Sequence, residues 1–194
     1  MGTASKIISV ILRVGELVCA SIVTGILGYY LSILDDADVP DDGRIVYAVA
    51  IGGISIFFSL VLMPPLRYSF WAFPLDLALF ICWMVAFGLL CNRSGTQGCD
   101  SVWYWNTWGY YWGGWWRTVP VARISPAIVG YGGCSSWRSS LAFSFIGGII
   151  WFGNALLGLY VSFSSRKDPA RADSESSSQP QTKESENPAA VEQS

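Results

Sequence analysis

The sequence contains no histidine, and only 13% of its 194 residues are charged. Histidine is the usual general base and metal ligand of proteins, so its absence removes the central residue of most hydrolase and zinc sites. An average soluble domain carries about 25% charged residues. The formal net charge of −2 offers no basic surface for nucleic acid. We therefore expect no soluble enzyme, no metal, no cofactor and no nucleic-acid partner.

Apolar sequence is abundant and falls into four long stretches. Each reaches the roughly 20 residues that a helix needs to cross about 30 Å of hydrocarbon. We predict an all-α integral membrane protein with four antiparallel transmembrane helices. They cover residues 7–34, 45–63, 70–90 and 141–163.

The segment from residue 164 to residue 194 has no aromatic residue and no Leu, Ile, Met or Cys. It buries too little apolar surface to offset the entropy of ordering. We therefore expect a disordered cytoplasmic tail after a transmembrane domain at residues 7–163.

Basic residues near the ends of the helices predict the orientation, because they favour the cytoplasmic side. Six of them share one side if both termini are cytoplasmic. They are Lys6, Arg13, Arg67, Arg166, Lys167 and Arg171. We expect a protein of this kind in the plasma membrane or in membranes of the secretory pathway.

Three ionisable residues lie within the predicted spans. Arg13 and Asp76 each lie six residues after the start of a helix that enters from the same side, so we expect them at similar depth. Glu16 follows Arg13 by three positions and can share its guanidinium. The favoured interpretation is structural pairing, with Arg13 reaching the headgroups and Asp76 capping a first turn as simpler alternatives. The other hypothesis is a polar path for ions or protons.

The predicted loop between the third and fourth helices, residues 91–140, is rich in Trp and Tyr. Amphipathic rings with an N–H or O–H group prefer the headgroup zone of a membrane. We expect these rings to cover the bundle at the membrane surface, with sterol, sphingolipid or sugar contact as the more specific alternative. The tryptophans are Trp103, Trp105, Trp108, Trp112, Trp115 and Trp116.

Three of the five cysteines lie in this loop, which the predicted orientation places in an oxidising compartment. Cys99 and Cys134 would close the loop around the aromatic run, and Cys91 with Cys134 is the alternative. Small residues spaced by four, such as Ala20, Thr24 and Gly28, favour close helix packing. That packing lies within the bundle in our interpretation, with association between copies as the alternative.

Three segments resemble MARVEL-domain membrane proteins of the fungal type. They are LRVGELVCASIVTGILGYYL from Leu12 to Leu31, LDLALFICWMVAF from Leu75 to Phe87, and CSSWRSSLAFSFIGGIIWFGNALLGL from Cys134 to Leu159. The resemblance implies four antiparallel helices in an M shape, both termini cytoplasmic, and no catalysis. It also implies a role in membrane apposition, lateral organisation or traffic, with lipids, further copies or other membrane proteins as partners. The rival hypothesis is a small channel or transporter subunit that uses Arg13, Glu16 and Asp76.

Overall fold

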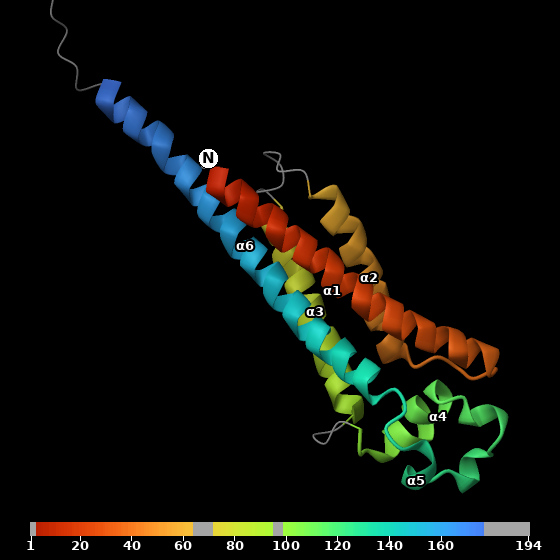
Figure 1. Cartoon of the computed structure of the whole chain (residues 1–194). Helices are drawn as coiled ribbons and strands as arrows, with labels where there is room; N and C mark the ends of the chain where they lie inside the picture. Colours follow the sequence, from red (N-terminus) through yellow and green to blue (C-terminus); the bar gives the residue numbers. More distant parts are fainter. Residues whose placement is uncertain (1–2, 64–71, 95–98, 177–194) are drawn as a thin grey trace, which may run out of the picture.

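The computed structural model describes residues 3–63, 72–94 and 99–176, and four long helices dominate it (Figure 1). They are α1 (Thr3–Asp36), α2 (Gly43–Val61), α3 (Phe73–Ser94) and α6 (Cys134–Ser176). Helix α1 packs on α2 and α6, and α3 completes the ring by packing on the same two helices. The predicted all-helical, four-span architecture is confirmed, because each of these helices is long and apolar enough to cross a membrane.

Local signals in the sequence set where these helices begin. Asp42 caps α2, since its side chain accepts a hydrogen bond from the backbone N–H of Arg44 at 3.1 Å. Helix α3 carries Asp76 in its first turn and Arg93 in its last turn, the arrangement that a helix dipole favours. Gly133, at a φ of 74°, turns the chain immediately before α6 begins.

The bounds of all four helices differ from the prediction, and those of α6 differ most. Helix α6 begins at Cys134, seven residues before residue 141, because the polar start of this helix gave no hydropathy signal. The same helix continues to Ser176, so the expected tail boundary at residue 164 falls inside a helix. Ala, Arg and Lys, which are good helix formers, make up 5 of the 13 residues from 164 to 176, and Pro169 lies among them. Residues 177–194 of the expected tail lie outside the described residues.

Glycines let helices approach closely at two places in the bundle. A Cβ at Gly52 of α2 would collide with Thr24 of α1, and one at Gly148 of α6 would collide with Met84 of α3. By contrast, Gly25, Gly28 and Gly53 have no neighbouring atom within 4 Å. The small residues therefore serve packing within the bundle at some positions and remain open on its surface at others.

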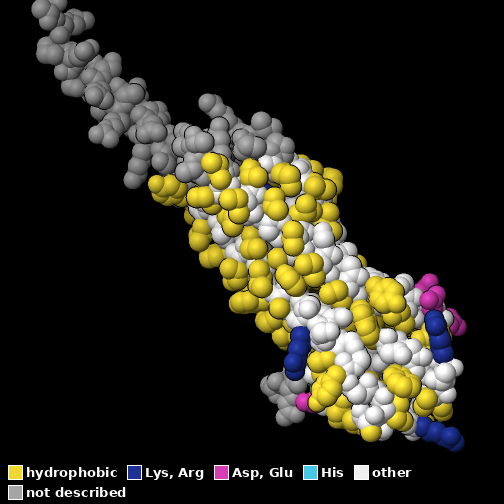
Figure 2. Space-filling model, viewed as in Figure 1, with side chains coloured by type: hydrophobic (Ala, Val, Ile, Leu, Met, Phe, Trp, Pro, Cys, Tyr) yellow, Lys and Arg dark blue, Asp and Glu magenta, His cyan; other side chains and the backbone are white. Residues whose placement is uncertain are grey.

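The surface of the bundle is apolar. Figure 2 shows hydrophobic side chains over the visible bundle, with charged ones gathered at the end that lies away from the N-terminus. Large exposed side chains from all four helices make up this surface, including Ile11, Phe57, Ile81 and Phe145. Such a surface is stable in hydrocarbon and would be unusual in water.

A compact cap, residues 99–133, covers one end of the bundle (Figure 1). It contains the π-helical segment η2 (Tyr104–Trp108), α4 (Gly109–Trp112), η3 (Trp115–Arg117), η4 (Val121–Arg123) and α5 (Pro126–Val129). The predicted long aromatic loop is therefore built from short helical turns.

Candidate functional site

The buried ionic cluster is centred on Arg13 of α1. Its Nη1 atom donates to Glu16 Oε2 at 2.9 Å, one turn along the same helix. Its Nη2 atom lies 2.8 Å from each carboxylate oxygen of Asp76 on α3, with hydrogen-bond geometry to Oδ2. The structure thus brings together the three ionisable residues that the sequence singled out. Their side chains are at most 2% exposed.

The other two helices complete the coordination of Glu16. Asn154 of α6 donates through Nδ2 to Glu16 Oε1, and Ser59 of α2 donates to Oε2 at 3.4 Å. The Arg13 guanidinium also lies over the Trp151 ring of α6, with Cζ 5.1 Å from the ring centroid. All four helices therefore contribute a side chain to one buried cluster.

This arrangement suits binding between helices better than chemistry on a substrate. A carboxylate or guanidinium alone at the centre of a bilayer costs about 2.5–3.5 kcal/mol on insertion scales. Here two carboxylates share one guanidinium and receive neutral donors from Asn154 and Ser59. Each charged group thus has a partner on another turn or another helix, while Arg13 Nε donates no hydrogen bond within the described residues.

Two of these partners were not predicted from the sequence. Asn154 gave a signal, as the most polar residue of the fourth apolar stretch, but nothing indicated which helix it would face. Ser59 gave none, because serine is common in membrane helices and often bonds its own backbone. A second buried pair was also missed, in which Trp83 of α3 donates from Nε1 to Ser55 Oγ of α2 at 2.9 Å.

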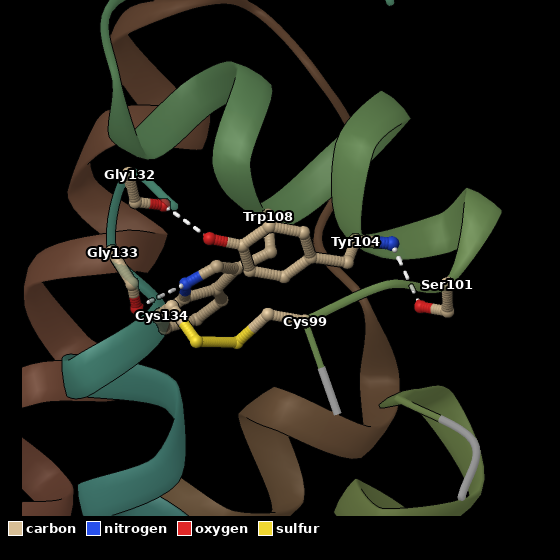
Figure 3. The surroundings of a disulfide bond; sticks show 7 residues. All are labelled: Cys99, Ser101, Tyr104, Trp108, Gly132, Gly133 and Cys134. Carbon is tan, nitrogen blue, oxygen red and sulfur yellow. Dashed lines mark hydrogen bonds between the residues drawn. A yellow bond between two sulfur atoms is a disulfide. The ribbon is translucent and has the colours of Figure 1, made fainter. Parts of the chain in front are cut away.

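The cap is joined to α6 by a disulfide between Cys99 and Cys134, whose Cα atoms are 5.8 Å apart (Figure 3). Of the two pairings considered, this one is present, and Cys91 is free. Tyr104 donates its hydroxyl to the Gly132 carbonyl at 2.6 Å, and Trp108 Nε1 donates to the Gly133 carbonyl at 3.0 Å. Burial raises the pKa of the Tyr104 hydroxyl, and the charge of Arg138 partly opposes this shift. The hydroxyl therefore stays protonated and can donate this hydrogen bond.

The loop tryptophans do not all lie at the surface as expected. Trp108 is fully buried, so the expectation that its ring lies at the membrane surface is wrong. Its ring stacks on Tyr30 of α1 with centroids 4.3 Å apart, and packs on Trp137 of α6 at 4.7 Å. The rings of Trp103, Trp105, Trp112, Trp115 and Trp116 are partly exposed. The aromatic rings therefore have two roles. Trp108 packs the cap against the helices, and the partly exposed rings lie on the surface of the cap.

Four apolar spans around a buried ionic cluster define a multi-pass integral membrane protein. The family model MARVEL, described as a membrane-associating domain, matches residues 6–157. The chain belongs to the MARVEL family, as the resemblance implied. No curated protein and no solved structure matches the chain.

Proposed function

We propose that this protein organises a membrane laterally, or holds membranes together, as a non-catalytic scaffold. The observation that carries the proposal is the buried cluster, in which Arg13, Glu16 and Asp76 are paired and at most 2% exposed. Residues that line a path for ions or protons must face a wet cavity. A paired and dry cluster instead fixes the helices around an apolar outer surface.

The proposed setting is the plasma membrane or the secretory pathway, with both termini in the cytoplasm. The disulfide supports this orientation, because such bonds persist in oxidising compartments. Tags at residues 1 and 194 should then both resist protease added outside sealed vesicles. Cleavage of either tag would contradict the orientation.

Lipids and further copies of the chain are the proposed partners. The partly exposed rings of the cap, such as Trp105 and Trp116, suit contact with sterol or sphingolipid headgroups. The open glycines Gly25 and Gly53 would let a second apolar helix approach closely.

The test compares the scaffold with the channel in one preparation. The full chain is reconstituted in phospholipid vesicles with and without sterol, and energy transfer between donor-labelled and acceptor-labelled copies is measured beside ion and proton flux. A scaffold predicts energy transfer above that of randomly placed copies, with flux equal to that of protein-free vesicles. Flux that disappears in a stably folded Asp76→Asn variant would overturn the proposal and support a channel.

A further inference from the structure

The part of the cap furthest from the N-terminus is residues 116–131, which we call the tip (Figure 1). Glycines with positive φ bound it, Gly114 with a φ of 72° before it and Gly130 with a φ of 55° near its end. Tyr110 donates its hydroxyl to the Val119 carbonyl at 2.7 Å, which ties the tip to α4. The tip therefore presents its side chains from a fixed backbone.

The tip exposes apolar side chains beyond the helix ends. Val121 is 51% exposed, Ile128 is 37% exposed and Tyr131 is 76% exposed. Exposed apolar groups on the bundle are explained by the surrounding lipid, but the backbone of the tip lies past the ends of α3 and α6 (Figure 1). An apolar surface at this place needs another partner.

Charge on the tip is of one sign. Residues 101–167 contain no Asp or Glu, and Arg117 and Arg123 are exposed. In the part of the chain that the structure describes, neither arginine forms an ion pair. Figure 2 shows basic and hydrophobic side chains together on this end of the molecule. Arginine beside aliphatic and tyrosine side chains matches a phospholipid surface, which offers phosphate above an apolar layer.

Residues outside the tip lie at the boundary of the bilayer that holds the bundle. Arg44 lies in the first turn of α2 and Arg93 in the last turn of α3, where Arg93 pairs with Asp42 at 2.8 Å. Charged residues at helix ends mark the boundary between hydrocarbon and headgroups. The tip lies past these helix ends (Figure 1), so it faces away from the bilayer that holds the bundle.

We propose that the tip docks on the phospholipid surface of a second, apposed membrane. Arg117 and Arg123 bind lipid phosphates there, and Val121 and Ile128 enter the layer beneath them. This inference rests on the proposed function, because it assigns the membrane-apposing activity to a surface and names its partner.

The experiment places the full chain in nanodiscs of neutral phosphatidylcholine and measures flotation with vesicles of phosphatidylcholine and phosphatidylserine. The double variant Arg117→Gln/Arg123→Gln should bind about 25-fold more weakly, since each arginine near an anionic surface contributes about fivefold. Val121→Ser/Ile128→Ser should weaken binding by at least about tenfold. The matched controls Arg138→Gln, on α6, and Val102→Ser, in the cap, change exposed residues outside the tip and should bind like the unaltered protein.

Equal binding by all of these proteins would overturn the inference, because the vesicles would then be held by basic residues near the termini. No vesicle binding by the unaltered protein would overturn it in favour of a protein partner. Docking that persists unchanged when phosphatidylserine is present only in the nanodiscs would overturn it, because the anionic lipid of the apposed membrane would then not be the partner of the tip. Energy transfer between copies in one membrane is measured without acceptor vesicles, so failure of lateral organisation is distinguishable from failure of docking.

Discussion

The bundle and the cap satisfy their polar groups in different ways. In the bundle, Arg13 is bound by carboxylates from two helices, and side chains from the remaining two complete the cluster. In the cap, Tyr104 and Trp108 donate to the backbone carbonyls of a glycine turn beside a disulfide. A bilayer supplies no water to replace a lost partner, whereas the cap lies where water is available. Removing one partner of a buried polar group should therefore lower the free energy of unfolding more in the bundle than in the cap.

The largest effect is expected from separating the members of the ionic cluster. Arg13→Gln should lower the free energy of unfolding by about 3–5 kcal/mol, because two buried carboxylates lose the guanidinium they share. Asp76→Asn should cost less, because Arg13 keeps its ion pair with Glu16. The double variant should cost less than the sum of the two. Unfolding by denaturant in detergent measures all four proteins, with Arg138→Gln as an exposed control. Strictly additive losses would show that the two residues are not coupled.

An intermediate effect is expected from opening the disulfide. Replacing Cys99 and Cys134 by Ser removes a link between residues 35 apart in sequence, which corresponds to about 2–4 kcal/mol. The loss should be confined to the cap, so protease should cut the cap faster while the bundle stays resistant. Cys91→Ser is the matched control, since Cys91 is free. Equal cleavage of the control and the double variant would contradict this view of the cap.

The smallest effect is expected from neighbouring glycines on α2. Gly52→Ala should destabilise the bundle by about 1–3 kcal/mol, because its Cβ would meet Thr24 of α1. Gly53→Ala should be neutral or stabilising by up to about 1 kcal/mol, since nothing lies within 4 Å of that Cβ and alanine favours the helix. Melting in detergent compares the two. Equal destabilisation would mean that Gly53 is also a packing position.

Much of the bundle could be predicted because each helix that crosses lipid must be long and apolar, and both properties can be read from the sequence. Length and hydropathy give the four spans, and matched depth along two helices from the same side places Arg13 near Asp76. The rotation of each helix about its axis is not encoded so directly. It decides that Ser59 and Asn154 face Glu16, and it depends on packing against all the neighbours at once.

The cap was harder to predict because its aromatic residues can serve either lipid or a core. Composition placed Trp108 at the membrane surface, but the structure buries it against Tyr30 and Trp137. Sequence spacing also left Cys91 and Cys99 as alternative partners for Cys134. The continuation of α3 to Ser94 keeps Cys91 within a helix, and Cys99 lies beyond that helix end.

The position of Trp108 has a mechanical consequence. Its ring touches α1 through Tyr30 and α6 through Trp137, and the disulfide joins the cap to the first residue of α6. If the ends of α1 and α6 move apart, one of these ring contacts must break, because a single indole cannot follow both helices. The cap therefore links α1 to α6, and a force applied to the cap acts first on those two helices.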